Sequence, residues 1–229
     1  GGPIYELMEM NGYVYYTVVA NNNKLQLRRT DGTAAGTSLV YEFIEYNGTA
    51  PVSALMKPIN GMLYFLLYDQ YGSGHDAIWR SDGTSAGTIL LKDLGTEYFG
   101  MGYFMSAGNK VCFMVNKPST STSVLLVTDG TAAGTVPLYE FMSVYNNNLY
   151  PAYVNIGSTL YFAAHDGVNG KELWKTDGTP GGTFLAADIN AGSANSAPTS
   201  MVELDNQLYF AATTVASGNE LWKFDGTIA

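Results

Sequence analysis

The chain has 229 residues, enough for one sizeable core, and we expect a single domain over 1–229. Its net charge of −9 would repel a phosphate backbone, and no Lys/Arg cluster offsets it, so we expect no nucleic acid partner. The apolar runs have the length of strands, far below the roughly 20 residues of a membrane-spanning helix, so we also expect no membrane insertion. Only 14% of the residues are charged, which favours a surface of the extracellular type.

A D-G-T turn recurs five times and divides the chain into units of about 48 residues. Such a fixed period is typical of a repeat architecture. The predicted units cover about 3–43, 52–93, 101–141, 151–189 and 198–229. The aspartates of the five turns are Asp31, Asp82, Asp129, Asp177 and Asp225.

Each unit contains strand-like pieces bounded by turn residues. In chain order these are 8–10, 14–18, 25–29 and 38–43, then 55–59, 63–68, 77–80 and 89–93, then 104–107, 111–115, 124–127 and 136–141, then 153–156, 160–164, 172–175 and 183–188, and finally 201–204, 208–212 and 220–223. The longest connection joins the fourth piece to the next first piece, as in a crossover between blades.

The expected fold class is therefore all-β. It is a β-propeller of five repeat units of about 48 residues with four antiparallel strands per blade, the last blade lacking its outermost strand. A closed ring is favoured over an open arc because the chain begins at an inner strand.

The repeated turn has a local explanation. The aspartate carboxylate accepts backbone N–H groups that follow it, and the glycine adopts φ > 0 without a Cβ clash. The two threonines of D-G-T-x-x-G-T are expected to restart an extended strand. A turn-former is needed in every blade, whereas a catalytic carboxylate is needed at one place, so we interpret the five aspartates as structural.

Aromatic residues recur at fixed places in the units and are expected to fill the core between sheets. Trp79, Trp174 and Trp222 share one site of the third strand, where the first and third units hold Arg28 and Leu126. The single cysteine, Cys112, cannot form an internal disulfide, and we interpret it as a small buried hydrophobe.

Residues 172–179 have the sequence E-L-W-K-T-D-G-T, and residues 220–227 have the sequence E-L-W-K-F-D-G-T. Both segments resemble the bacterial ELWxxDGT repeat family. The resemblance covers essentially the whole chain and weakens to T-D-G-T in the first and third units. It implies propeller blades in a large exported or cell-surface protein with flanking domains, and a binding or scaffolding task. It carries no catalytic residue.

The binding face is expected where the loops vary between units, at the crossovers and the hairpins between second and third strands. Tyrosine and asparagine in these loops suit carbohydrate or a protein surface. The candidate ligand-binding residues are Tyr46, Asn47, Tyr98, Phe99, Tyr145, Asn147, Tyr150, Asp166 and Asn169.

Other functions have less support. We expect no catalytic residues, no metal and no cofactor, because neither His75 nor His165 belongs to a recognisable triad motif. A calcium loop at 166–172 has too few acidic residues. A glycoside hydrolase using Glu9 and Glu203 is the enzymatic alternative, although their equivalent repeat positions indicate structural repetition. A second alternative is a purely structural segment of a larger surface protein.

Overall fold

The structure is a computed structural model that describes residues 2–22, 24–43, 52–68, 76–99, 103–142 and 152–226, with the backbone alone for 52–54. The chain divides into two compact units, Gly1–Gly100 with Gly130–Thr135, and Met101–Asp129 with Val136–Ala229. The single-domain expectation stays a prediction.

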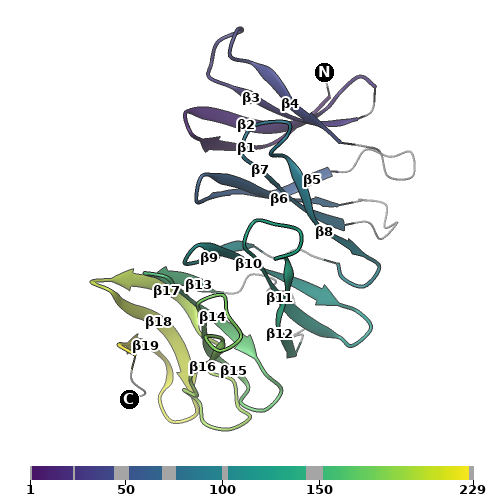
Figure 1. Ribbon diagram of the computed structural model, residues 1–229. Coiled ribbons are helices and arrows are strands. Elements are labelled where there is room, and N and C mark those ends of the chain that lie inside the picture. Colours follow the sequence, from purple (N-terminus) through teal and green to yellow (C-terminus); the bar gives the residue numbers. More distant parts are fainter. Residues whose placement is uncertain are drawn as a thin grey trace. The chain divides into compact units, whose positions relative to one another are not determined.

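The described residues form an all-β fold of five small antiparallel sheets without a helix (Figure 1). All nineteen predicted strands are present, several with one to four additional residues at an end. The sheets are β1 (Ile4–Met10), β2 (Tyr13–Val19), β3 (Leu25–Thr30) and β4 (Ser38–Glu42); β5 (Val52–Ile59), β6 (Met62–Tyr68), β7 (Asp76–Ser81) and β8 (Ile89–Gly95); β9 (Phe104–Ala107), β10 (Lys110–Lys117), β11 (Thr122–Thr128) and β12 (Val136–Met142); β13 (Tyr153–Ile156), β14 (Thr159–His165), β15 (Lys171–Thr176) and β16 (Phe184–Ala187); and β17 (Thr199–Leu204), β18 (Gln207–Thr214) and β19 (Gly218–Phe224).

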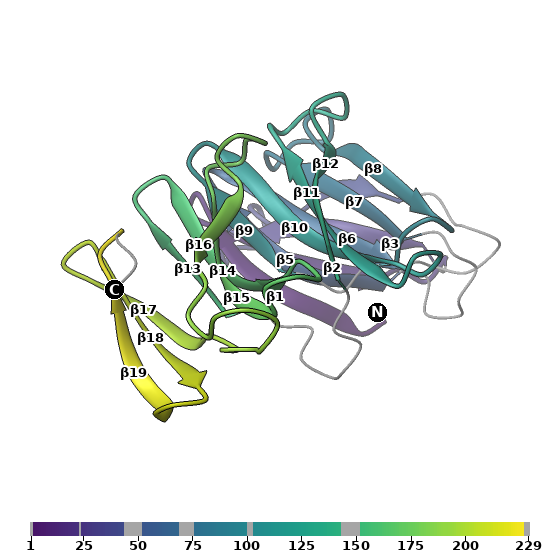
Figure 2. The ribbon, with the colours of Figure 1, turned by 90° about the horizontal axis from the view of Figure 1, so that it is seen from below.

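In every sheet the strands pair in sequence order. The fifth sheet has three strands in the described part of the chain, as predicted, and β19 lies at its edge (Figure 2). In such a meander, the hairpin between second and third strands and the exit from the fourth strand lie at the same end of the sheet. The D-G-T turns lie at the other end.

The hairpins between first and second strands are tight because their residues adopt left-handed backbone angles. Asn11 and Gly12 have φ of 53° and 79°, and Asn60 and Gly61 have 52° and 72°. Two successive positive φ values are the geometry of two-residue hairpin turns that match strand twist. Asn-Gly pairs therefore form the tight turns at this end of the first two sheets.

A β-bulge interrupts the first strand of three sheets at one repeat position. Glu6, Leu55 and Ser200 lie at these irregularities, with φ of 40°, 61° and 52°. Non-glycine residues rarely adopt such angles, so the surrounding sheet must stabilise them. In the first compact unit, the Glu6 carboxylate stabilises the bulge of the second sheet. It accepts the backbone N–H groups of Leu55 at 2.7 Å and Met56 at 2.5 Å.

The core between sheets repeats one aromatic arrangement. Trp79 meets Phe43 edge to face at 5.1 Å between ring centroids, and Trp174 meets Phe141 in the same way at 5.0 Å. The third-strand tryptophan thus packs against the fourth strand of the preceding sheet, as the core prediction requires. Arg28, at the tryptophan position of the first sheet, is half-buried and donates to Gln26 Oε1 at 3.0 Å.

Candidate functional site: the polar turns and loops at the sheet ends

The D-G-T turn is held by a small hydrogen-bond network. In the fourth sheet, Asp177 Oδ1 accepts the backbone N–H of Thr179 at 2.8 Å and its hydroxyl at 2.6 Å. The same hydroxyl oxygen accepts the N–H of Gly182 at 3.0 Å. The turns at Asp31 and Asp82 repeat this pattern. Each of these three aspartates therefore holds the backbone of its own turn.

The role predicted for the threonines is wrong in part. They do not restart the strand; Thr179 bonds to the aspartate, and Thr183 Oγ1 donates back to the Thr179 carbonyl at 2.7 Å. β16 begins only at Phe184. The hydroxyl geometry closes the turn before the chain extends, which β-propensity alone does not indicate.

The two glycines of the motif are needed for different reasons. Gly178 has a φ of 81°, as predicted. A Cβ on Gly182 would lie 2.0 Å from the Asp177 carboxylate, and the same clash recurs at Gly36 and Gly87. The second glycine is therefore required by the close approach of the carboxylate.

A hydroxyl immediately before the aspartate completes the turn, and sequence reasoning missed it. Thr176 Oγ1 accepts the N–H of Gly178 at 2.9 Å and lies 2.7 Å from Thr183 Oγ1. Equivalent contacts occur at Thr30 and Ser81. The signal was available in the sequence as S/T before D-G-T, and the fifth unit departs from it with Phe224.

These contacts stabilise the ionised aspartates. The hydrogen bond from the Thr179 hydroxyl is the main reason that the pKa of Asp177 lies below its ordinary value, and Thr33 and Thr84 act in the same way on the pKa of Asp31 and Asp82. The carboxylates are thus engaged with their own turns and remain charged at neutral pH.

Glu172 is the most deeply buried carboxylate in the described residues, at 0% exposure. Its Oε2 accepts the N–H of Ile189 at 2.9 Å and the Ser196 hydroxyl at 2.5 Å, while Oε1 accepts the Ser196 N–H at 2.7 Å. The crossover loop after β16 supplies all three donors. The glutamate of E-L-W therefore anchors the connection to the fifth sheet.

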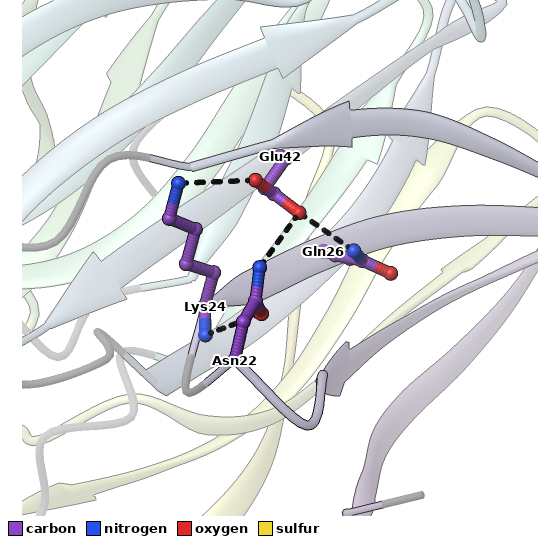
Figure 3. Close-up of polar contacts among 4 residues, drawn as sticks. All are labelled: Asn22, Lys24, Gln26 and Glu42. Carbon is purple, nitrogen blue, oxygen red and sulfur yellow. Dashed lines mark hydrogen bonds and ion pairs between the residues drawn. The ribbon is translucent and has the colours of Figure 1, made fainter.

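Acidic residues near the end of the fourth strand hold the hairpin of their own sheet. Glu42 accepts a hydrogen bond from Gln26 at 2.8 Å and lies 3.2 Å from Lys24 Nζ, and Asn22 reaches the same carboxylate (Figure 3). The hydrogen bond from Gln26, then that from Lys24, lowers the pKa of Glu42. Glu140 holds the equivalent hairpin of the third sheet through Thr122, at 2.5 Å.

Of the predicted ligand-binding residues, Asp166 and Asn169 are brought together in the 165–170 loop. Asn169 Nδ2 donates to Asp166 Oδ2 at 2.7 Å, and Asp166 Oδ1 accepts the N–H groups of Val168 and Asn169 at 2.8 and 2.7 Å. Burial raises the pKa of Asp166, but the hydrogen bonds from Asn169 and Val168 outweigh it, so the pKa lies below its ordinary value. The pair shapes the loop and leaves Val168, 69% exposed, as its accessible side chain.

Tyr98 and Phe99 lie in the crossover after β8 and differ from each other. Tyr98 is 7% exposed, its N–H donates to the Leu94 carbonyl at 3.2 Å, and Lys92 Nζ lies 5.8 Å from its ring centroid. Its ring is therefore a packing residue, contrary to the expectation that it faces a ligand. Phe99 is 41% exposed and stays available for contact. The remaining candidates, Tyr46, Asn47, Tyr145, Asn147 and Tyr150, lie outside the described residues.

The two carboxylates of the glycosidase alternative each cap their own hairpin. Glu9 Oε1 accepts the N–H of Gly12 at 3.0 Å, and Glu203 Oε1 accepts the N–H of Asn206 at 2.7 Å. Repeated turn capping explains why the two glutamates share a repeat position.

Cys112 is fully buried, and burial raises the pKa of its thiol to about 12. It is therefore a core residue, as predicted. Within the described ranges no three His, Cys, Asp or Glu side chains are grouped to hold a metal ion. The same residues contain no helix long and apolar enough to cross a membrane.

No family model and no curated protein sequence matches the chain. Among solved structures, oligopeptidase B from Leishmania major aligns with a TM-score of 0.57 at 14% identity, over 98% of this chain and 32% of that one. The acylaminoacyl peptidase of Pyrococcus horikoshii aligns with a TM-score of 0.52 at 9% identity, over 97% and 38%. The chain spans about a third of the length of these peptidases. At such identities the similarity concerns the fold alone.

Proposed function

We propose that the five sheets are blades of a β-propeller module in an exported bacterial surface protein of the ELWxxDGT type. In this proposal the module is non-enzymatic. It binds carbohydrate through the loops at the end of each sheet that carries the hairpin between second and third strands. In this proposal, flanking domains belong to the same polypeptide.

One observation carries the proposal: the repeated carboxylates are engaged in holding backbone. Asp177 closes a turn, Glu203 caps a hairpin and Glu172 anchors a crossover loop. These carboxylates accept hydrogen bonds from the backbone of turns and loops, which favours a scaffold role over a catalytic role. The loops opposite the D-G-T turns differ between sheets and expose apolar side chains such as Phe99 and Val168.

A glycan array with the purified 229-residue chain tests this function. We expect at least one glycan class to bind, and Phe99→Ala or Val168→Ser to weaken that binding by roughly tenfold. Leu204→Ser is the matched control, because Leu204 is 57% exposed and lies beside a hairpin at the other end of its sheet. It should change binding by less than about twofold.

Two results would overturn parts of the proposal. An array without any bound glycan would leave the module purely structural. Release of sugar from a bound glycan, lost in Glu9→Gln or Glu203→Gln, would make the protein a glycoside hydrolase.

A further inference from the structure

Two adjacent strands of the fourth sheet bring two nitrogen-bearing side chains to the same place. His165, the last residue of β14, is the cross-strand partner of Lys171, the first residue of β15. Directly opposed residues of an antiparallel pair project from the same face of the sheet, with their Cβ atoms about 5 Å apart. The two side chains therefore lie beside each other, at the end of the sheet that carries the loops proposed to bind carbohydrate.

Lys171 is firmly placed, and its charge is not compensated. Its backbone N–H donates to Asn195 Oδ1 at 2.7 Å, and its carbonyl oxygen accepts the N–H of Ala197 at 2.9 Å. The side chain is half-buried and, within the described ranges, forms no ion pair. Burial lowers the pKa of Lys171 below its ordinary value, because the ammonium loses hydration that no carboxylate there replaces. An anionic group bound from outside would supply the missing opposite charge.

His165 offers a second donor beside this charge. Its Nδ1 accepts the backbone N–H of Gly167 at 2.8 Å, so the proton of the neutral ring lies on Nε2. In the part of the chain that the structure describes, Nε2 has no hydrogen-bond partner. The neighbouring Asp166 carboxylate accepts its hydrogen bonds from within its own loop. One ammonium and one ring N–H are therefore free to bind the same acceptor.

The pair is a departure from the repeat. The same cross-strand position holds Val19 and Leu25 in the first sheet, and Asn116 and Ser123 in the third. The first of these pairs is apolar, and in the second the Ser123 hydroxyl donates to Asn116 Oδ1 at 3.1 Å. A pair that the sheet needed for folding would recur from one sheet to the next, as the D-G-T turns do. The two donors of the fourth sheet therefore call for a local explanation.

We propose that Lys171 and His165 bind an anionic group, a carboxylate or a sulfate, of an acidic glycan. This inference rests on the proposed function and names its ligand class. Lys171 Nζ supplies the charge, and His165 Nε2 donates a hydrogen bond to the same group. Val168, exposed in the hairpin loop between them, contacts the sugar ring. The net charge of −9 repels polyanions in general, so binding of an acidic glycan depends on this local pair.

Two matched sets of oligosaccharides test the charge and its source. Oligogalacturonate and its methyl ester differ in carboxylate charge, and a sulfated galactan oligosaccharide and its desulfated form differ in sulfate charge. Binding of each to the 229-residue chain is measured by isothermal titration calorimetry. In at least one set, the charged oligosaccharide should bind roughly tenfold more tightly than its neutral counterpart, and that set identifies the anionic group.

Two lysine variants of β15 locate the charge. Lys171→Met removes the ammonium but keeps the length of the side chain, and it should reduce the preference for the charged oligosaccharide to less than about twofold. Lys175→Met makes the same change of net charge beside the D-G-T turn and should alter affinity by less than about twofold. Since Lys171→Met removes a half-buried charge, its melting temperature should not fall, which separates lost binding from unfolding.

A histidine variant tests the second donor. His165→Asn keeps a side-chain acceptor for the Gly167 N–H and removes the Nε2 donor, so it should weaken binding of the charged oligosaccharide by roughly threefold. Equal affinity for charged and neutral oligosaccharides would overturn this inference and leave the proposed function intact, whereas no glycan binding would overturn both. Equal effects of the two lysine variants, or tighter binding of an oligoglutamate peptide than of any glycan, would also overturn it.

Discussion

In β15 of the fourth sheet, Glu172 and Leu173 are both 0% exposed, whereas in β19 of the fifth sheet Leu221 is 77% exposed and Glu220 faces solvent. The two strands share the word E-L-W-K. Leu173 packs in a cluster with Leu208 and Phe210 of the next sheet, and Glu172 is covered by the crossover loop. The difference teaches that burial of the repeated segment depends on the sheet and loop that cover it, because the same four residue types occur in both strands.

The leucine pair should give the largest effect. Leu173→Ala should lower the free energy of unfolding by about 3 kcal/mol, because it removes a fully buried side chain and leaves a cavity. Leu221→Ala should cost less than about 0.5 kcal/mol. Urea denaturation followed by circular dichroism measures both. Equal costs would mean that the fifth sheet is covered in solution.

The glutamates Glu172 and Glu220 test the same difference between the two strands for polar contacts. Glu172→Ala should cost about 2 kcal/mol, since the Ser196 and Ile189 N–H groups lose a charged acceptor and the loop must rearrange. Glu220→Ala should leave the unfolding free energy within about 0.5 kcal/mol of the parent chain. Faster hydrogen exchange at 189–196 in Glu172→Ala alone would identify the loop as the affected element.

The turn aspartate should give the smallest effect, and one that depends on pH. The pKa of Asp177 is lowered in the folded chain, so its charge contributes stability above the ordinary Asp pKa, and this contribution is lost as pH falls through the folded value. Asp177→Asn should therefore cost about 0.5 kcal/mol at pH 7, because the site is well exposed to solvent, and this cost should shrink as the pH falls through the lowered pKa of Asp177. The exposed Glu97→Gln is the control. A cost of Asp177→Asn that does not change with pH would contradict the role of charge.

The strands and turns could be predicted because their causes are local. Alternating apolar residues, Asn-Gly pairs and the Asp177 turn each act within a few residues of chain, and they recur with the period of the repeat. The threonine role was predicted wrongly because hydroxyl contacts such as Thr176 with Thr183 form only once the turn has closed.

The location of the candidate site stays a prediction, and the contacts of its residues could not be foreseen from the sequence. Variable loops marked one end of each sheet. Within these loops, however, Tyr98 is buried as a packing residue, and Asp166 accepts a hydrogen bond from Asn169. Whether a loop aromatic packs or projects depends on neighbours supplied by other strands, which single-residue chemistry does not specify.

The sequence by itself determined the period, the strand order within each sheet and the glycine positions of the turns, because backbone sterics and short-range hydrogen bonds act over a few residues. Only the tertiary structure decided which of the two identical E-L-W-K segments, 172–175 or 220–223, is buried. The hydrogen-bond donors to Glu172 lie as far along the chain as Ser196, and the side chains that cover Leu173 belong to β18. A contact across that separation forms only when whole sheets pack, so Glu172 and Leu173 are core residues whereas Glu220 and Leu221 lie at the surface.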